Sequence, residues 1–174
     1  MNSFKYHYVK VLKQDFLTKF NYENSLQIPS LKKTVLSFGV TPSTLRNLLP
    51  SLGALFLVSS QKPCLVACKR PNLTLKFKGG AAIGCKLDLR GKDQFLFFEK
   101  LVLCILPRLK NFHYTVANNN VFFKIDNLFL FKEIEKEYDY FQDLSDLSVN
   151  LTFKAQTSQE VLVFLHALKW PLVS

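Results

Sequence analysis

Three histidines and four cysteines are the side chains that could bind a metal ion or act in catalysis. His7, His113 and His166 are far apart in the sequence, and none has a cysteine or a carboxylate at the spacing of a metal site or a catalytic triad. Cys64 and Cys68 form a C-x₃-C pair, but residues four apart on a strand lie roughly 13 Å from each other, and no second pair of ligands follows. The sequence therefore predicts no metal site, no cofactor and no enzymatic activity.

The glycines and the remaining cysteines also give no catalytic pattern. Gly79, Gly80 and Gly84 match neither the dinucleotide fingerprint nor the P-loop, because no Lys-Ser/Thr pair follows them. The four cysteines are scattered, and three of them lie in apolar runs typical of strands or helices. We expect them to be buried free thiols, which is the usual state of cysteine in a reducing compartment.

Phosphate binding is the chemistry that the sequence does support, in a long basic loop predicted over residues 69–84. Loops of this length in compact domains are usually functional or disordered. Phosphate recognition needs cations held away from the body of the protein and exposed backbone N–H groups. Phe77 is a candidate for stacking on an unpaired base, and the alternative is a solvated loop without a ligand. The candidate residues are Lys69, Arg70, Lys76, Phe77, Lys78, Gly79 and Gly80.

The net charge of +10 is unevenly distributed along the 174 residues. Residues 1–110 hold 18 Lys and Arg against 5 Asp and Glu, whereas residues 111–174 hold 5 against 8. Between Asn24 and Leu87 there are nine basic residues and no acidic one. A solvated face usually mixes both signs, so this run favours a polyanionic partner.

Periodicity in the first half predicts a helix, a strand, a second helix and two strands that flank the basic loop. The helix spans about residues 4–20, and its apolar face consists of Tyr8, Val9, Leu12, Phe16 and Phe20. The strand Leu31–Gly39 is apolar and β-branched. Thr41-Pro42 begins a helix that reaches about Val58, with Pro50 inside it. The two further strands are Cys64–Cys68 and Cys85–Leu89.

The second half predicts helices near Asp93–Leu106 and Val161–Leu168, the latter after a capping box at Thr157–Glu160. Strands are predicted at Val121–Ile125, Leu128–Phe131 and Ser148–Lys154, the first two joined by a turn at Asp126-Asn127. An acidic segment at about 133–146 is predicted to be a loop or irregular. The order favours one α+β domain over residues 1–174: an antiparallel or mixed sheet with helices packed on one face and a long basic inter-strand loop.

Membrane and targeting signals are weak. The most apolar stretches, Leu48–Val58 and Phe95–Leu106, are shorter than the roughly 20 residues that span a bilayer, so no membrane insertion is expected. The segment Met1–Phe20 is basic and amphipathic, as transit peptides are, but it contains Asp15 and no arginine. We therefore expect it to belong to the folded chain.

Short segments in a fixed order carry a resemblance over nearly the whole chain. The segments are Phe20-Asn21-Tyr22-Glu23-Asn24, Gln27-Ile28-Pro29, Gly39-Val40, Gln61-Lys62-Pro63, Ile83-Gly84-Cys85-Lys86, Leu89-Arg90-Gly91, Phe98-Glu99-Lys100-Leu101, Leu106–Phe112, Ala155–Leu165 and Trp170-Pro171. Together they resemble the universal large-subunit ribosomal protein five family, which binds 5S ribosomal RNA. Each motif is weak alone, but the ordered set is specific.

The resemblance implies a structural protein of the large ribosomal subunit and not an enzyme. An α+β fold would present one face to a 5S RNA stem and loop in the central protuberance. The basic loop at 69–84 would reach the tRNA in the peptidyl site. The family also contributes a bridge to small-subunit protein thirteen and has neighbours among the large-subunit proteins.

The resemblance also implies particular RNA-contacting positions. The family's Asn, Gln and Thr contacts fall on Ser37, Gln61 and Asp88, of which only Gln61 matches. A carboxylate at Asp88 would repel phosphate unless it pairs with Lys86, Arg90 or a base amino group. The full set predicted to bind ribosomal RNA is Lys32, Lys33, Ser37, Gln61, Lys62, Lys86, Asp88 and Arg90. The family's glycine-rich segment after Phe112 is replaced by the shorter stretch Tyr114–Asn120, which affects the bridge surface.

These departures, with high Phe, Leu, Asn and Lys usage, favour a divergent mitochondrial copy over a plastid or bacterial cytoplasmic one. Because some mitochondrial ribosomes lack 5S RNA, the RNA partner is 5S RNA or a substitute ribosomal RNA segment. The mildly acidic C-terminal third is the candidate protein-facing surface. The rival hypothesis is a free-standing basic module that docks on an acidic protein or on a membrane surface.

Overall fold

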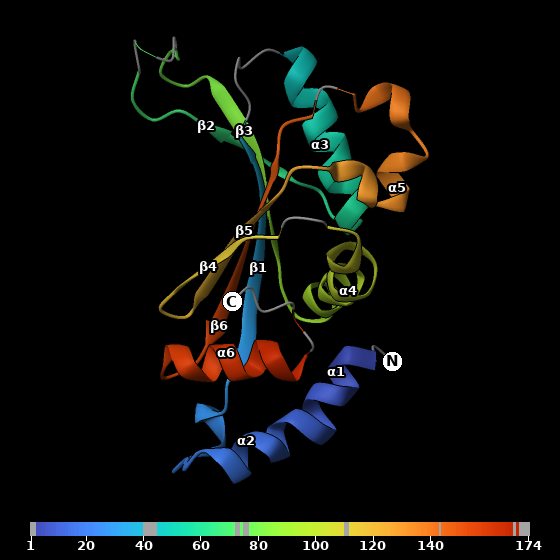
Figure 1. Cartoon of the computed structure of the whole chain (residues 1–174). Helices are drawn as coiled ribbons and strands as arrows, with labels where there is room; N and C mark the ends of the chain where they lie inside the picture. The colour runs from blue at the N-terminus through green and yellow to red at the C-terminus, as the bar shows by residue number, and fades with distance from the viewer. Residues whose placement is uncertain are drawn as a thin grey trace. The chain divides into compact units, whose positions relative to one another are not determined.

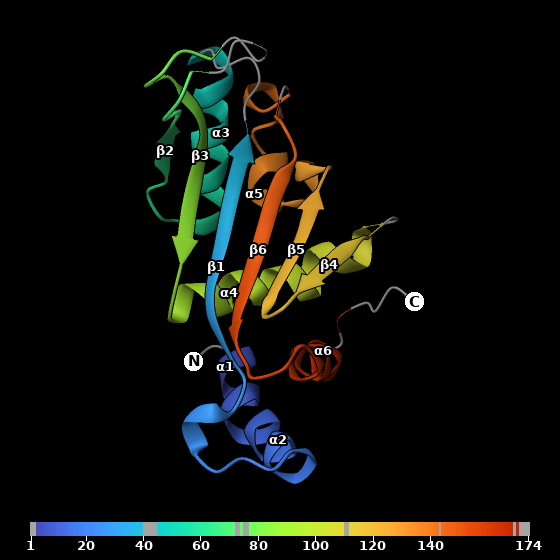
Figure 2. The ribbon, with the colours of Figure 1, turned by 90° about the vertical axis from the view of Figure 1, so that its left-hand side faces the viewer.

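Six strands pair into one antiparallel sheet in the order β2-β3-β1-β6-β5-β4, and helices accompany it (Figures 1 and 2). This confirms the α+β class. The computed structural model describes residues 3–39, 45–71, 74, 77–109, 112–142, 144–168 and 170. The strands are β1 (Ser30–Gly39), β2 (Cys64–Ala67), β3 (Ala82–Leu89), β4 (Tyr114–Ala117), β5 (Asn120–Ile125) and β6 (Leu147–Lys154).

Backbone contacts divide the chain into two compact units whose boundaries fall inside strands. Unit 1 comprises Met1–Thr34, Leu89–Phe123 and Asn150–Ser174, and unit 2 comprises Val35–Asp88 and Lys124–Val149. The helices of unit 1 are α1 (Ser3–His7), η1 (Tyr8–Leu12), α2 (Lys13–Lys19), η2 (Ser25–Gln27), α4 (Lys92–Lys100), η3 (Leu101–Ile105), η4 (Leu106–Arg108) and α6 (Ser158–Ala167). Those of unit 2 are α3 (Leu45–Ser59), η5 (Leu128–Leu130), α5 (Lys132–Glu135) and η6 (Tyr138–Tyr140).

The N-terminal helix runs without interruption through α1, η1 and α2, which confirms the prediction of a helix at about 4–20. Tyr8, Leu12 and Phe16 are buried, but Val9 is 46% exposed, so its predicted place on the apolar face is wrong. The reason is that η1 is a π-helix. Its wider turn brings residues four apart into line and moves the neighbour of Tyr8 away from that line.

The core of unit 1 is rich in aromatic rings from distant parts of the sequence. Trp170 stacks on Phe98 at 5.6 Å between ring centroids and meets Phe112 and Phe123 edge-on at 5.6 and 5.5 Å. The predicted cap of α6 is present, since Thr157 accepts a hydrogen bond from the backbone N–H of Glu160 at 3.4 Å. The Glu160 carboxylate accepts from the N–H of Gln156 at 2.9 Å, which fixes the start of the helix.

The β-hairpin of unit 1 is not where the sequence places it. Tyr114–Ala117 is a strand, and it pairs with β5 through a two-residue turn at Asn118-Asn119. Asn118 has φ +54°, in the left-handed region that asparagine tolerates better than most residues. Asn119 also donates a side-chain hydrogen bond to the Ala155 carbonyl at 2.6 Å. The stretch that replaces the expected glycine-rich segment is therefore a tight hairpin.

Unit 2 places α3 and α5 in contact with each other, and both lie on the same face of its strands (Figures 1 and 2). The prediction of a strand at Leu128–Phe131 is wrong, because Leu128–Leu130 is a 3₁₀ turn capped by the Asn127 side chain, which accepts from Phe129 N–H at 3.0 Å. The acidic segment is not irregular throughout, since it contains α5 and η6. The predicted helix start at Thr41-Pro42 lies outside the described residues.

Two other expectations concern the cysteines and membrane insertion. All four cysteines are free, but only Cys85 is buried, while Cys64 and Cys104 are exposed and Cys68 is half-buried. The expectation that they are buried is therefore wrong for most of them. Within the described part of the chain, no helix has both the length and the apolar character that a bilayer crossing requires.

Candidate nucleic-acid interface

Strand β3 separates buried from exposed side chains in unit 2. Cys85 and Leu87 are buried on the face that α3 covers, whereas Lys86 and Asp88 are exposed on the other face. Cys64 of β2 pairs with Lys86 in the antiparallel register and therefore shares its face. Burial raises the pKa of the Cys85 thiol to about 11, so this cysteine is an inert core residue. The strand thus presents a lysine, a carboxylate and a thiol on one uncovered face.

The neighbouring elements of unit 2 add the matched glutamine and a second lysine. Ser37 on β1 is half-buried and alternates with the buried Leu36 and Phe38, so it shares the uncovered face. Gln61 follows α3 and is half-buried, and its backbone N–H donates to the Ser59 hydroxyl at 3.3 Å. Lys62 is exposed two residues before Cys64. Five of the eight residues predicted to bind ribosomal RNA therefore belong to unit 2.

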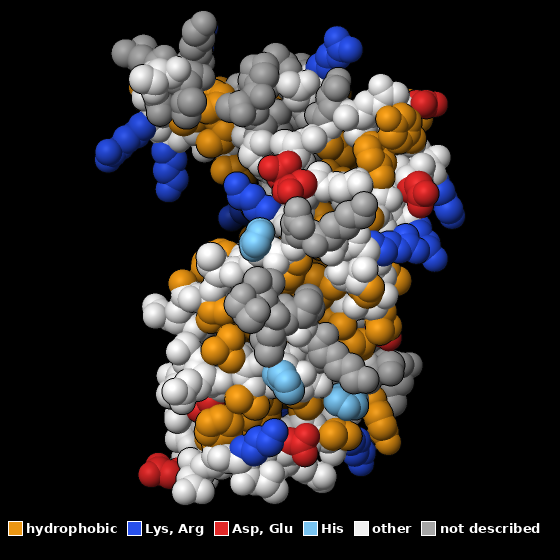
Figure 3. Space-filling view, viewed as in Figure 1, with side chains coloured by type: hydrophobic (Ala, Val, Ile, Leu, Met, Phe, Trp, Pro, Cys, Tyr) orange, Lys and Arg blue, Asp and Glu red, His pale blue; other side chains and the backbone are white. Residues whose placement is uncertain are grey.

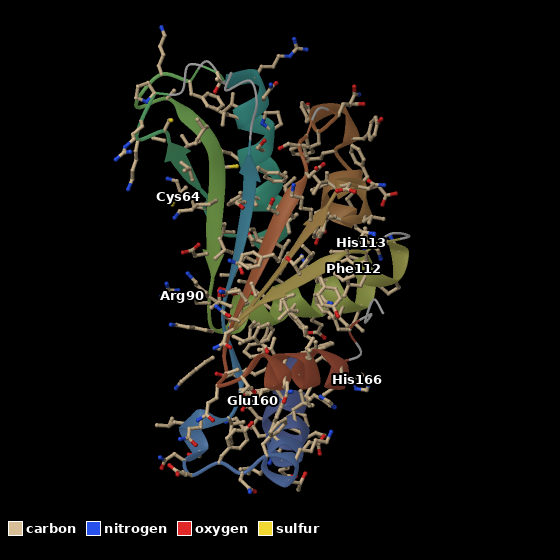
Figure 4. The ribbon with its side chains drawn as sticks, turned by 60° about the vertical axis from the view of Figure 1, so that its left-hand side comes forward. Cys64, Arg90, Phe112, His113, Glu160 and His166 are labelled. Atoms are coloured by element: carbon tan, nitrogen blue, oxygen red, sulfur yellow. The ribbon has the colours of Figure 1, made fainter. Side chains whose placement is uncertain are left out.

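The other three residues of the predicted set belong to unit 1. Lys32 is exposed and Lys33 is half-buried at the start of β1. Arg90 is exposed directly after β3, where Figure 4 labels it. All three are accessible to a ligand of unit 1.

The basic loop is a hairpin extension of β2 and β3 with a hydrogen-bonded base. Cys68 N–H donates to the Ala81 carbonyl, and Gly80 N–H donates to the Cys68 carbonyl, both at 2.8 Å. Lys78 accepts from Ala81 N–H at 3.1 Å in a turn that holds Gly80 at φ +82°, a conformation that favours glycine. The loop spans residues 68–81, so the predicted end at Gly84 is wrong, because Ala82–Gly84 belongs to β3.

The loop exposes most of its predicted cations. Lys69, Arg70 and Lys78 are exposed, as are Gly79 and Gly80. Phe77 is half-buried, and Lys76 lies outside the described residues. In Figure 3, Lys and Arg side chains gather beneath this end of β2 and β3 at the upper left.

Two residues on the uncovered face of unit 2 were missed by sequence reasoning. Lys124 is exposed on β5, between the buried Phe123 and Ile125. Cys64 is exposed opposite Lys86. The alternation in Val121–Ile125 carried the signal for Lys124, but the face of Cys64 depends on its pairing with β3.

The acidic residues of unit 2 lie elsewhere, on the helical segment that follows η5. Glu135, Glu137 and Asp139 are exposed on or beside α5 and η6, and red side chains mark this region at the upper right of Figure 3. Because α5 is packed with α3 on the covered face, unit 2 separates its charges between two faces. A polyanion is attracted to the uncovered face and repelled by the helical one.

The histidines and cysteines do not form a catalytic or metal-binding cluster in the described part of the chain. His113 precedes β4 and His166 lies on α6, both exposed (Figure 4). No group of three or more His, Cys, Asp or Glu side chains among the described residues is placed to hold a metal ion.

Comparison with known proteins decides the family. The family model that describes the C-terminus of the ribosomal protein uL5 family matches residues 82–172. "Large ribosomal subunit protein uL5m" of Reclinomonas americana is 31% identical over 99% of this chain and 98% of its own length. The chain belongs to the uL5 family of ribosomal proteins. "Large ribosomal subunit protein uL5" of Mycoplasma pneumoniae is 32% identical over 99% of both chains, and that of Wolbachia pipientis wMel is 33% identical over 97% of this chain and 98% of its own.

Membership in the uL5 family makes the chain a structural constituent of the large ribosomal subunit, with ribosomal RNA and other ribosomal proteins as partners, and not an enzyme. The resemblance identified from the ordered motifs is therefore confirmed. Mitochondrial and bacterial members of the uL5 family match this chain equally well.

Proposed function

We propose that the chain binds 5S ribosomal RNA, or an equivalent ribosomal RNA segment, in the central protuberance through the uncovered face of its β2, β3 and β1 strands. The observation that carries the proposal is the separation of charge in unit 2. Lys62 and Lys86 are exposed on or beside the β2–β3 pair, whereas the exposed acidic cluster belongs to the helical segment. Phosphates need such cations, and Gln61 adds a side chain that both donates and accepts hydrogen bonds.

Asp88 fits this proposal as a base contact and not as a phosphate contact. Its carboxylate is exposed on the same face as Lys86, two residues along β3. A carboxylate accepts hydrogen bonds from a cytosine amino group. Lys86 offsets its charge towards nearby phosphates, so the pair selects a base edge next to the backbone.

Replacing Lys62 and Lys86 by alanine is expected to weaken binding to 5S RNA and to flatten its dependence on salt. Each phosphate contact contributes roughly 0.7 to 0.9 to the slope of log K against log salt concentration. The slope should therefore fall by roughly 1.4 to 1.8 for the double variant. Titration of labelled 5S RNA at several salt concentrations measures it, with an unrelated hairpin RNA as the competitor.

The matched control changes two exposed lysines of the helical segment, Lys132 and Lys136, to alanine. These lysines lie beside the acidic residues and should leave the slope unchanged. Cys64 gives a second readout, because RNA bound at this face should block its alkylation while the exposed Cys104 of η3 stays reactive. Equal affinity for both RNAs, or alkylation of Cys64 in the complex, would contradict the proposal and favour a general basic module.

We also propose that the loop at 68–81 contacts tRNA in the peptidyl site. Its exposed cations Lys69, Arg70 and Lys78, and the hydrogen-bonded base that holds them away from the sheet, support this role. Changing these three residues to alanine should lower crosslinking between the loop and peptidyl-site tRNA several-fold. Incorporation into the large subunit should stay near the wild-type level, because the loop base uses backbone groups. Loss of incorporation would instead assign the loop to ribosomal RNA.

The proposed location is the mitochondrial ribosome, supported by the chain's composition and by its similarity to a mitochondrial relative. The proposed partners include neighbouring large-subunit proteins and small-subunit protein thirteen. The hairpin Tyr114–Asn120 stands where the family has a longer segment, so the proposed bridge would use a smaller surface. Co-sedimentation of the chain with mitochondrial large subunits tests the location.

A further inference from the structure

Helix α3 of unit 2 carries an apolar stripe on its outer side. Leu49 is 63% exposed and Phe56 is 53% exposed, and the half-buried Leu52 lies between them. Their spacing of i, i+3 and i+7 puts them on one side of the helix. Exposed apolar side chains are common singly, but a stripe at this spacing is the ridge onto which another helix packs.

The stripe lies next to the segment that contains η6. A side chain on Gly53 would meet the ring of Phe141 at 3.4 Å, so Phe141 packs directly on α3 at this position. At 3.6 residues per turn, Leu49 and Phe56 lie within about 60° of Gly53 around the helix. Tyr138 and Tyr140, which precede Phe141, are 53% and 75% exposed. The apolar stripe and the two tyrosines therefore border one surface.

The charge around this surface is negative. Glu135, Glu137 and Asp139 are exposed in the segment that leads to Phe141, and α3 itself contains no acidic residue. This arrangement repels ribosomal RNA and anionic lipid, which leaves a protein among the partners of a ribosomal subunit. A protein that fits both features must present apolar side chains at helical spacing with lysine or arginine beside them.

We propose that the outer side of α3, with its acidic border, is a docking surface for a basic amphipathic helix of a neighbouring protein. Leu49 and Phe56 supply the apolar anchor, and Glu135, Glu137 and Asp139 select a positive partner. This surface is on the covered face of unit 2, so the proposal goes beyond RNA binding.

The experiment uses the full chain and a fluorescein-labelled amphipathic helix of about 18 residues composed only of leucine and lysine. Fluorescence anisotropy at physiological salt measures its affinity. Two matched peptides serve as probes of specificity: one replaces every lysine by glutamate, and the other has the same composition in scrambled order. The wild-type chain should bind the leucine-lysine helix at least tenfold more tightly than either.

Paired variants locate the binding. Leu49→Gln with Phe56→Gln should weaken binding at least tenfold, whereas Leu96→Gln with Leu103→Gln, which removes two exposed leucines of α4 and η3, should not. Neutralising Glu135, Glu137 and Asp139 as amides should weaken binding and reduce its salt dependence. Circular dichroism of each variant establishes that the fold is retained, and the affinity of each for 5S RNA should not change.

Three results would overturn the proposal. The first is equal binding of the acidic or scrambled peptide, and the second is equal weakening by both leucine pairs. The third is self-association of the wild-type chain that Leu49→Gln with Phe56→Gln abolishes, because the stripe would then serve a second copy. Failure of 5S RNA binding by the wild-type chain would contradict the proposed function and leave the peptide result unaffected.

Discussion

Replacement of Gly84 by alanine is expected to lower the free energy of unfolding by about 3 kcal/mol. Gly84 lies in β3, and an added Cβ would fall on the backbone carbonyl oxygen of Phe38 in β1. A backbone group cannot rotate away as a flexible side chain does, so one of the two strands must move. Urea denaturation measures the change, and the melting temperature should fall by roughly 6 to 12 °C.

Gly39 is the matched control, because nothing lies within 4 Å of its added Cβ and its φ is not positive. Gly39→Ala should change the free energy of unfolding by less than about 1 kcal/mol. If the two variants unfold at the same urea concentration, the close approach of β3 to β1 at Gly84 is incorrect. The displaced strand also carries Lys86, so Gly84→Ala should weaken RNA binding.

Replacement of Trp170 by alanine is expected to cost about 3 to 5 kcal/mol. The indole is 3% exposed and contacts the rings of Phe98, Phe112 and Phe123. Its removal leaves a cavity among rings that come from separate segments and cannot all close in. Differential scanning calorimetry of the full chain measures the loss.

Two further variants test the cause of this loss. Trp170→Phe should cost clearly less than Trp170→Ala, because the indole N–H is buried without a hydrogen-bond partner among the described residues. Tyr140→Ala removes an exposed ring and should change stability by less than about 0.5 kcal/mol. Equal destabilisation by Trp170→Ala and Tyr140→Ala would show that the aromatic cluster does not hold the core of unit 1.

Gly84 and Trp170 both lie in motifs that the sequence alone could only match to a family. Gly84, in Ile83-Gly84-Cys85-Lys86, lets two strands approach closely, and the same motif places Lys86 on the exposed face. Trp170, in the terminal Trp-Pro motif, fills the space between a helix and two segments of the sheet region. The first motif serves both the fold and the proposed RNA contact, whereas the second serves the fold.

Sequence patterns were sufficient where an element is fixed by its own residues. The alternation of Val149, Leu151 and Phe153 predicted β6 correctly, because period-two burial defines a half-covered strand. The Thr157 cap of α6 is likewise local chemistry. Local signals misled at Leu128–Phe131, where an apolar run forms a 3₁₀ turn, since short apolar runs fit a strand and a buried turn equally well.

The sequence by itself determined the α+β class, the family and the excess of positive charge before residue 110. It could not assign those charges to faces, because a residue's face depends on which strand pairs with which and on what covers them. Only the tertiary structure placed Cys64 opposite Lys86 and packed Phe141 on Gly53. Such contacts join residues more than 20 positions apart, and no periodicity within one segment encodes them. The acidic segment and the stripe of Leu49 and Phe56 consequently became neighbours only in the folded chain.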